Sequence, residues 1–463
     1  MRNEQAVVIG GSVAGLLAAA AAAPHFERVV VLERDRLEDE PVARKGAPQG
    51  NQIHILLPIG ERMIAELFPG IHEEFIAAGC TECNEAADLP AITALGWRPR
   101  VRLEIADVIA FRRPLLELVI RRRLLALDNV EIRQASVTGL RLQGDGPRLA
   151  GVLLDDGEEV DAELVIDAGG RGTKSPKWLR QLGFDVPDED EVRVYMGYAT
   201  QFVEVPDGVF EGGAKGFAAL PWPGQLAGGV MMPADNGVHV VTAVGMMKDY
   251  PPADREGMLE FLERAPSPLV AEAARRSKPV SEVHTYRQPG NLWRHWETLA
   301  NRPGRFLAVG DAVASFNPVY GQGMTMAALG ARLLAASLAD GATDLDEVPL
   351  AFQRRLAPEV GVAFGMAAGG DAFFEGAELR NFEPPSAEAA AFLERIGELA
   401  THDVEVVTAL MEAFFYLRPE ALESASIAAK VAALEAGGGA APTAVDPRAF
   451  PRTVLPDPAE TAA

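Results

Sequence analysis

The first thirty-five residues restrict the possible fold more than any other part of the chain. They contain an apolar stretch at 6–9, the segment GGSVAG, an alanine-rich run, and a second apolar stretch at 29–32 followed by Glu33. This order predicts a strand, a tight turn, a helix and a parallel second strand. The free N–H groups and positive dipole end of such a helix bind phosphate, and an acidic residue after the second strand can accept hydrogen bonds from ribose hydroxyls. The segment therefore predicts a nucleotide-binding unit.

The glycine turn departs from the usual fingerprint at one position. Gly10 permits the sharp turn and Gly15 lets the helix lie close to the sheet, but the middle glycine of G-x-G-x-x-G is Ser12. A bound phosphate must therefore approach a backbone that carries a small side chain. The competing interpretation is a signal peptide, because Arg2 precedes an apolar run at 6–23. The Gly-Gly-Ser interruption and the strand with an acidic end favour the nucleotide unit.

Composition restricts the partners. The 463 residues carry a formal net charge of −23, which argues against nucleic acid and against an anionic membrane surface. Outside the amino-terminal run, no stretch of about twenty residues lacks charges and turn-forming residues, so we expect no membrane-spanning segment. We expect a cytoplasmic protein.

The chain has only two cysteines, Cys80 and Cys83. A zinc site would need two further ligands, and no suitable cysteine or histidine pair follows. A redox disulfide remains an alternative, but we expect two reduced thiols and no metal.

Further elements are expected after the nucleotide unit. A loop at 44–58 carries charged and polar side chains and precedes a helix. A second helix begins at Pro114, a favoured first-turn residue. Its predicted apolar face contains Leu115, Leu118, Val119 and Leu125.

Three short strands and a buried strand follow that helix. The strands at 130–133, 137–142 and 149–154 predict a small antiparallel insert. The buried strand at 162–167 ends in DAGGRGTKSP, which places Asp167 at the carboxyl end of a strand. Open α/β sheets bind ligands at that edge.

The sequence pattern changes at about residue 192. Residues 192–283 are rich in strand-forming segments and predict a separate antiparallel sheet, whose Phe217, Met231 and Met232 are expected to form an apolar lid over a pocket. A strand at 306–309 then leads to a second glycine-rich helix start at 321–323, which is a second potential anion site.

These segments together predict an α/β protein. It consists of a Rossmann-type domain with a parallel sheet and a small antiparallel insert, an inserted antiparallel β-sheet substrate domain, and C-terminal helices. The predicted boundaries are 1–190 and 285–345 for the two parts of the Rossmann-type domain, 191–284 for the β-rich domain, 346–436 for the helical region, and 437–463 for a tail. The tail is rich in glycine, alanine and proline, which predicts disorder.

Several separated motifs resemble one family. GGSVAG, Glu33, Arg44, Arg113, DAGGRG and GDAVASFNPVYGQGM occur in the order found in FAD-dependent monooxygenases of the aromatic-hydroxylase and squalene-epoxidase group. The phrase RKGAPQGNQIHILLPIG is most similar to bacterial members that epoxidise polyene chains. The resemblance covers residues 1 to about 345 and implies that the Rossmann-type domain binds FAD.

The resemblance also assigns cofactor contacts. It places the first glycines and Glu33 at the ADP half, Arg113 near the pyrophosphate, Asp167 at a second nucleotide-contacting turn, Asp311 at the ribityl chain, and the helix start at the flavin pyrimidine edge. The complete set of expected cofactor-binding residues is Gly10, Gly11, Ser12, Val13, Ala14, Gly15, Glu33, Arg34, Arg44, Lys45, Arg113, Val137, Asp167, Asp311, Pro318, Gly321, Gln322, Gly323 and Met324.

The resemblance implies a monooxygenase of secondary metabolism. Reduced FAD reacts with O2 to give a hydroperoxide whose distal oxygen attacks an electron-rich substrate, here an apolar small molecule that is epoxidised or hydroxylated. NAD(P)H supplies the electrons directly or through a separate flavin reductase. The alternatives are a prenyl reductase, a halogenase, a phenol hydroxylase and a non-catalytic flavin-binding protein; the halogenase motif Trp-x-Trp-x-Ile-Pro is absent from the sequence.

No catalytic residue is assigned, and His54 is the only candidate. It is the one histidine of seven that lies in a motif loop. A phenol hydroxylase would benefit from a base there, whereas oxygen transfer to an alkene needs none. We expect His54 to hold the Arg44 loop by a hydrogen bond.

Overall fold

The computed structural model describes residues 3–144, 146–340, 344–437 and 445–457. The first of its two large sheets has five strands in the order β20-β13-β1-β2-β9, in which all neighbours are parallel. The strands are β1 (Asn3–Ile9), β2 (Phe26–Glu33), β9 (Val130–Gln134), β13 (Leu164–Asp167) and β20 (Phe306–Ala308). β13, β20 and the second halves of β1 and β2 are buried, as expected for parallel strands covered on both faces, whereas the edge strand β9 is only partly buried. The predicted parallel sheet is confirmed.

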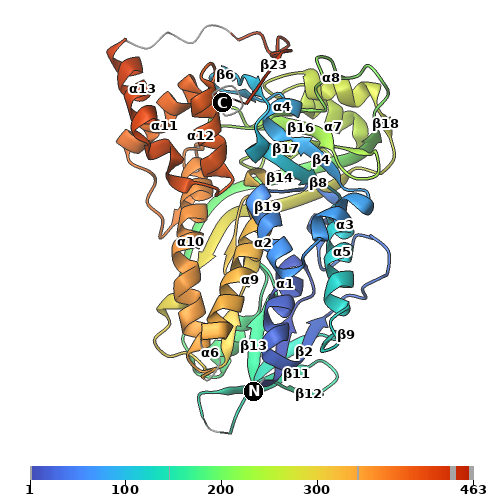
Figure 1. The fold of residues 1–463 in the computed structure, drawn as a ribbon, viewed down its shortest axis with the longest axis vertical. Coiled ribbons are helices and arrows are strands. Elements are labelled where there is room, and N and C mark those ends of the chain that lie inside the picture. The colour runs from blue at the N-terminus through green and yellow to red at the C-terminus, as the bar shows by residue number, and fades with distance from the viewer. Residues whose placement is uncertain (1–2, 145, 341–343, 438–444, 458–463) are drawn as a thin grey trace.

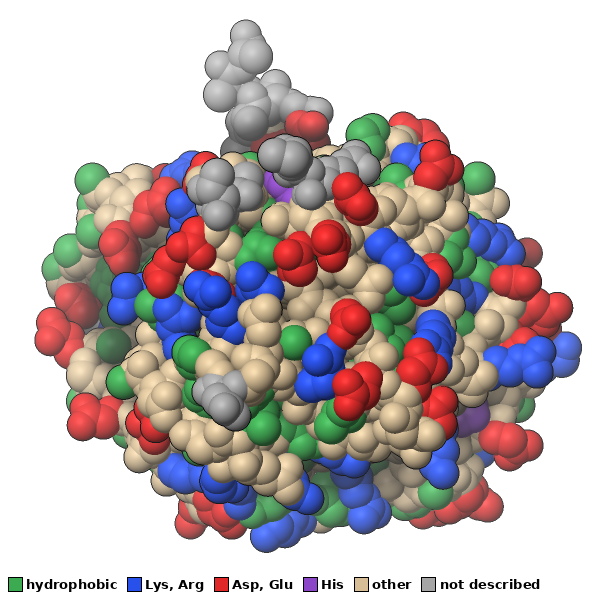
Figure 2. All heavy atoms as spheres, turned by 90° about the horizontal axis from the view of Figure 1, so that it is seen from below, with side chains coloured by type: hydrophobic (Ala, Val, Ile, Leu, Met, Phe, Trp, Pro, Cys, Tyr) green, Lys and Arg blue, Asp and Glu red, His purple; other side chains and the backbone are tan. Residues whose placement is uncertain are grey.

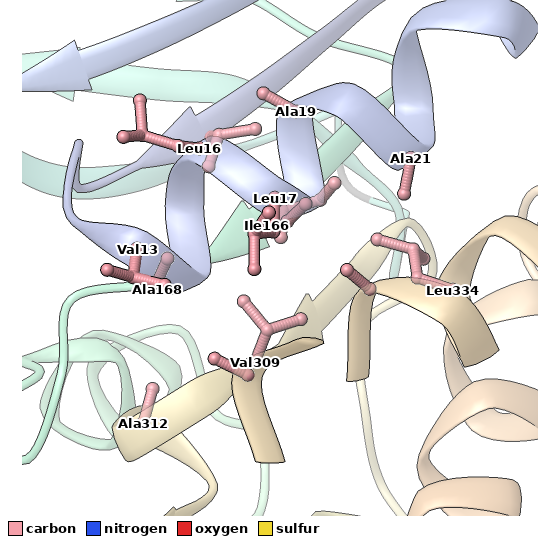
Figure 3. Packing of buried hydrophobic residues seen from close by; sticks show 14 of the residues in the cluster. Val13, Leu16, Leu17, Ala19, Ala21, Ile166, Ala168, Val309, Ala312 and Leu334 are labelled. Atoms are coloured by element: carbon pink, nitrogen blue, oxygen red, sulfur yellow. The ribbon is translucent and has the colours of Figure 1, made fainter. Parts of the chain in front are cut away.

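Helices pack closely around this sheet. Helix α1 (Val13–Ala22) contacts both α5 (Arg113–Leu125) and the long helix α9 (Gly323–Asp340), which in turn packs on α10 (Val348–Asp371). The alanines of α1 are buried on nearly every face, which allows this close approach. Figure 3 shows Leu16 and Leu17 of α1 close to Ile166, with Val309 and Leu334 on the side of α9. The helix face predicted for α5 needs one correction, because Leu125 is exposed at the end of the helix.

The antiparallel insert has three strands, as predicted, but one of them differs from the prediction. It contains β10 (Val137–Leu142), β11 (Leu149–Leu154) and the additional strand β12 (Glu159–Asp161). The strand predicted at 130–133 does not belong to it, because β9 pairs in parallel with β2 at the edge of the main sheet. Periodicity identifies a strand but not its partner, so the sequence placed β9 in the wrong sheet.

The second large sheet is antiparallel and has the order β15-β16-β17-β14-β19-β21. Its strands are β14 (Glu189–Glu204), β15 (Phe217–Ala219), β16 (Ala227–Pro233), β17 (His239–Gly245), β19 (His284–Arg294) and β21 (Ala314–Ser315), and β18 (Lys278–Pro279) and β22 (Glu378–Arg380) also pair with β14. Helices α7 (Arg255–Leu262) and α8 (Leu269–Arg276) cover one face (Figure 1). The expected boundary between 284 and 285 falls at the start of β19, so this sheet extends past it.

A third region lies at the upper end of the molecule in Figure 1. It combines short elements from residues 55–110 with the C-terminal helices α11 (Ala387–Leu399), α12 (Val404–Phe414) and α13 (Ala425–Ala436), which share one apolar cluster. The short elements are α4 (Glu85–Asp88), β3 (Ile55–Leu56), β4 (Thr81–Asn84), β5 (Ile92–Thr93), β6 (Gly96–Trp97), β7 (Arg100–Val101) and β8 (Asp107–Ala110). Helices α2 (Pro58–Leu67) and α3 (Ile71–Ala77) pack instead beside α9 and α5. Helix α6 (Ser175–Gln181) lies instead beside β10.

Part of the expected disordered tail is packed. Strand β23 (Val454–Leu455) pairs with β7, and Phe450 is buried against Trp97 and Phe217. The expectation of disorder is wrong for residues 445–457, because it was based on composition, which does not take account of the packing of Phe450. Residues 438–444 and 458–463 lie outside the described residues.

The surface charge and the helix lengths are relevant to the expectation that the protein binds neither nucleic acid nor a membrane. Figure 2 shows acidic and basic side chains interspersed over the lower face of the molecule. Among the described residues, no helix combines the length and apolar character needed to cross a bilayer.

Cys80 and Cys83 are both buried free thiols, and burial raises the pKa of each to about 12. In the described part of the chain no group of histidine, cysteine and carboxylate side chains could hold a metal ion.

Candidate functional site

A single cavity of about 780 Å³ connects the edge of the parallel sheet to the antiparallel sheet and to helix α12. The structure brings together most of the residues that the sequence singled out. Those that line the cavity are Gly10, Ser12, Val13, Ala14, Glu33, Arg34, Arg44, His54, Arg113, Val137, Asp167, Asp311, Pro318, Gly321, Gln322, Gly323 and Met324. Gly11, Gly15 and Lys45 were also expected at the cofactor but do not line it.

The glycine turn at one end leaves no room for side chains. Gly10 has φ +104°, and a Cβ there would lie 2.6 Å from the carbonyl oxygen of Ala168. A Cβ on Gly15 would lie 1.8 Å from the carbonyl oxygen of Gly10, so Gly15 acts by helix packing and not by ligand contact. No side chain caps the first turn of α1. Its amide groups are therefore available to an anion.

Ser12 does not cap α1 because its hydroxyl is used elsewhere. It donates to Glu117 Oε1 (2.5 Å) and accepts from Arg113 (2.8 Å). Glu117 also accepts from Arg113 (2.9 Å) and from Arg44 (3.2 Å). The serine that replaces the usual glycine is thus part of a buried hydrogen-bonded network beside the glycine turn.

Sequence reasoning missed Glu117, the centre of this network. It is 7% exposed and lies one helical turn after Arg113 in α5. Burial would raise the pKa of Glu117, but Arg113 and Arg44, helped by the Ser12 hydroxyl, hold that pKa below its usual value. The i,i+4 spacing of Arg113 and Glu117 was the available signal.

Glu33 ends β2 beside the same turn. Its carboxylate accepts from the backbone N–H of Gly11 (2.8 Å) and of Asp35 (3.0 Å), and it lies 3.2 Å from a guanidinium nitrogen of Arg44. A carboxylate has about four acceptor positions. Glu33 therefore retains capacity for a hydroxyl donor in the cavity.

Asp167 organises its own loop. It is fully buried and accepts from the N–H of Gly169 (2.8 Å) and the hydroxyl of Thr173 (2.5 Å). Burial raises its pKa, against these hydrogen bonds. From the same loop, Arg171 donates to the carbonyl of Gly290 (2.6 Å) and so joins the two large sheets.

The second helix start faces the middle of the cavity. Gly321 has φ +68° and redirects the chain into α9, whose first residues Gly323 and Met324 line the cavity. The side-chain oxygen of Gln322 is buried and has no partner among the described residues. Burial raises the pKa of the nearby Asp311, although Arg113 and Arg171 oppose this shift.

A buried cluster fixes the loop before α9. Asp371, at the end of α10, accepts from Asn291 (2.8 Å), Asn317 (2.9 Å) and Tyr320 (3.0 Å). Asn317 in turn caps the following short turn through the N–H of Val319. Sequence reasoning missed this cluster because its members are far apart in the chain.

His54 is held as a neutral imidazole. Its Nδ1 lies 2.9 Å from the carbonyl oxygen of Gln52, so Nδ1 carries the proton and donates. Burial and then the charge of Arg113 lower its pKa to about 3. The hydrogen bond is made within its own loop, and the ring stacks on Phe111.

The far end of the cavity is mainly apolar. Val230 and Met232 of β16 line it, together with Tyr198, Leu220 and Val244. Phe217 and Met231, which we expected in the lid, belong instead to the cluster under α7 and α8. Side chains alternate along a strand, so Met231 and Met232 point to opposite faces.

The cavity fits an elongated anionic dinucleotide. One end has a turn without side chains, the N-terminus of α1 and two largely buried arginines. The N-terminus of α9 lies at the middle, and an apolar chamber follows. The fold is that of the FAD-binding flavoprotein oxygenases. It resembles the flavin-dependent brominase Bmp2 (TM-score 0.66, 13% identity, 89% of this chain and 93% of that chain). It also resembles PqsL, a probable FAD-dependent monooxygenase from Pseudomonas aeruginosa (TM-score 0.60, 18% identity, 80% and 98%).

Sequence comparison identifies the family. No protein-family model matches the chain. Protein Rv3254 of Mycobacterium tuberculosis is 34% identical over 349 residues, which cover 73% of each chain. The chain belongs to the same family as that protein. Rifampicin monooxygenase of Streptomyces venezuelae is 31% identical over 168 residues, which cover 36% of this chain and 32% of that enzyme.

Proposed function

We propose that this protein is an FAD-dependent monooxygenase that inserts one oxygen atom from O2 into a small-molecule substrate. The observation that carries the proposal is the continuity of one cavity from the glycine turn through the start of α9 to an apolar chamber. The likeness to PqsL and to rifampicin monooxygenase supports the reaction class.

The residues present divide into four roles under this proposal. The amides at the start of α1, with Arg44 and Arg113, would hold the pyrophosphate, and Glu33 would accept from the ribose. Bound FAD would supply the redox chemistry with O2. The amides at the start of α9 would face the electron-rich edge of the flavin, where their dipole favours negative charge. The apolar face of β16 and β17 would exclude water from the substrate.

Epoxidation of an alkene or polyene is the specific reaction we favour. The observation behind this choice is the neutral, hydrogen-bonded state of His54, the histidine that lines the cavity, because its lowered pKa prevents this imidazole from titrating near neutrality. Oxygen transfer to an alkene requires no base, whereas phenol hydroxylation usually benefits from one. The likeness to the brominase is one of fold, and the chain lacks Trp-x-Trp-x-Ile-Pro.

Labelled oxygen tests the proposed function. The FAD-loaded protein is incubated with NADH or NADPH, with and without a flavin reductase, under ¹⁸O2 and a panel of polyenes and phenols. The proposal predicts product that has gained one labelled oxygen atom. Equal turnover without oxygen would assign a reductase instead, and halide incorporation in the presence of bromide would assign a halogenase.

A further inference from the structure

The chamber end of the cavity contains charges that the proposed reaction does not use. Glu85 at the start of α4, Arg98 between β6 and β7, and Arg100 in β7 all line the cavity. They interrupt walls that are otherwise apolar, such as Leu89 and Met411. The nucleotide-binding turn is at the opposite end, so these charges belong to the substrate end.

Arg98 is half-buried and lines the cavity. Within the described part of the chain, no side chain forms an ion pair or a hydrogen bond with it, and the only charge that influences its pKa is Glu85. Burial lowers the pKa of Arg98, because the cation loses hydration. A planar guanidinium carries five N–H donors in a fork that matches the two oxygens of a carboxylate.

Glu85 does not neutralise Arg98 fully. One of its carboxyl oxygens is buried and has no hydrogen-bond partner among the described residues. Burial raises the pKa of Glu85 to about 7, with Arg98 opposing the shift. Near neutral pH a substantial fraction of Glu85 is therefore uncharged.

Arg100 adds a second positive charge behind Arg98. It is 1% exposed and donates to carbonyl oxygens, those of Ala87 (2.7 Å) and Gly212 (2.6 Å) among them, while its remaining terminal nitrogen has no partner in the described chain. The nearest acid, Asp88, is already paired with Lys215 (2.9 Å). Carbonyl contacts satisfy donors without cancelling charge, so this end of the cavity is positive in a chain whose net charge is −23.

The C-terminal segment holds these arginines in place. The indole N–H of Trp97 donates to the carbonyl of Asp446 (3.0 Å), and β23 pairs with β7 at Arg100 and Val101. Arg100 also donates to the carbonyl of Arg452 (3.2 Å). Arg98 is thus presented from a backbone that is fixed at both ends.

We propose that Arg98, reinforced by Arg100, binds the anionic group of an otherwise apolar substrate, either a carboxylate or an ionised enol. This inference rests on the proposed function and changes its substrate class from apolar to amphipathic. An anion there would supply the hydrogen-bond acceptors that Arg98 lacks, while the substrate body would contact Leu89, Met411 and the sheet. Glu85 opposes anion binding when it is ionised.

Calorimetric measurement of probe binding to the FAD-loaded protein at pH 8 tests the proposed anion binding by Arg98. The probes are 2-naphthoate and dodecanoate, each with its primary amide, and 4-hydroxycoumarin as the ionised enol. We expect at least one acid probe to bind about tenfold or more tightly than its neutral counterpart, and Arg98→Gln to abolish that difference. Glu85→Gln should tighten binding of the same anion about threefold or more, because it removes the opposing charge. Tighter binding of the coumarin than of both acids would assign the anion to an enol.

Arg102→Gln is the matched control, because Arg102 is on the same segment but its side chain is 56% exposed and does not line the cavity. It should leave anion binding unchanged. Equal binding of acids and amides, or no binding of any probe, overturns the inference. If Arg98→Gln does not fold, the effect of Glu85→Gln on anion binding decides the question instead. A protein that does not take up FAD would instead contradict the proposed function, so the two failures are distinguishable.

Discussion

Glu117 shows how one side chain organises the nucleotide end of the cavity. It lies between Arg44 and Arg113 and accepts from Ser12, and all four groups are largely buried. Arg44 has further carboxylate neighbours, since its guanidinium lies 3.2 Å from Glu33 and 3.5 Å from Asp35, whereas Glu117 is the carboxylate that Arg113 contacts. Both arginines donate hydrogen bonds beside the first turn of α1, where a diphosphate would bind.

We predict that Glu117→Gln destabilises the FAD-free protein by about 3 kcal/mol, because it removes the carboxylate that Arg113 contacts and one of the three beside Arg44. The loss should be clearly smaller with excess FAD, since the diphosphate supplies negative charge. Denaturant unfolding with and without FAD measures both values. Glu131→Gln is the control: it removes an exposed ion pair with Arg28 and should cost less than about 1 kcal/mol. An equal loss in both states would show that the arginines do not face the cofactor.

The His54 ring tests the choice between epoxidation and phenol hydroxylation. We predict that His54→Gln slows single-turnover oxygen transfer by about tenfold or less, through roughly 1 kcal/mol of lost positioning. Because its pKa is lowered to about 3, the imidazole stays neutral and wild-type rates should show no His54 titration between pH 6 and 9. Stopped-flow kinetics across that range is the measurement. A thousandfold loss that removes a titration near neutrality would make His54 a general base.

At the scale of elements, the loop before α9 depends on α10. Asp371 accepts from three donors on two other segments, so it fixes the position from which α9 begins. The structure thereby couples the C-terminal helices to the helix start at the middle of the cavity.

We predict that Asp371→Ala costs about 2 to 4 kcal/mol of unfolding free energy, because Asn291, Asn317 and Tyr320 lose a buried acceptor. Tyr320→Phe removes one donor only and should cost about 1 kcal/mol. Urea unfolding monitored by circular dichroism compares the two variants. If both cost the same, the cluster is not a cooperative anchor for the loop.

The elements that could be predicted from the sequence are those with a local signal. The nucleotide unit, the helix after Arg112, strands β10 and β11, and the start of α9 follow from periodicity and turn residues. The partner of β9 and the packing of residues 445–457 could not be predicted, because each depends on contacts with distant segments. In the site, Asp371 was missed for the same reason, whereas Glu117 was missed although its i,i+4 spacing from Arg113 is a local signal.

At the scale of the whole molecule, the pH dependence of stability depends on His295, which links β14 to the turn that follows β19. Its Nδ1 lies 2.8 Å from Glu297 and its Nε2 lies 2.9 Å from Asp190 of β14, and its side chain is 18% exposed. The hydrogen bond to Glu297, followed by the contribution of Asp190, raises the pKa of His295 to about 9 against the effect of burial.

This raised pKa predicts a pH-dependent stability. The folded protein binds the proton more tightly than the unfolded chain does, so the stabilisation is fully present below about pH 6.5 and is lost as pH rises to about 9. The shift corresponds to roughly 3 kcal/mol. The difference between the unfolding free energies at pH 6 and at pH 10 should therefore be larger in wild type than in His295→Gln, by roughly 3 kcal/mol. Parallel pH profiles for the two proteins would contradict the assignment.

The central claim is that the cavity holds FAD without a covalent bond. The most direct measurement is the absorption spectrum of the purified full chain, before and after supplementation with FAD and gel filtration, with the released cofactor quantified after denaturation. The account predicts a yellow protein that carries one FAD per chain and releases intact FAD on unfolding. Glu33→Gln, which keeps the shape and removes the charge, should weaken FAD binding by about 1 to 3 kcal/mol. A wild-type protein that remains colourless after incubation with excess FAD would contradict the assignment of the cavity and with it the proposed reaction.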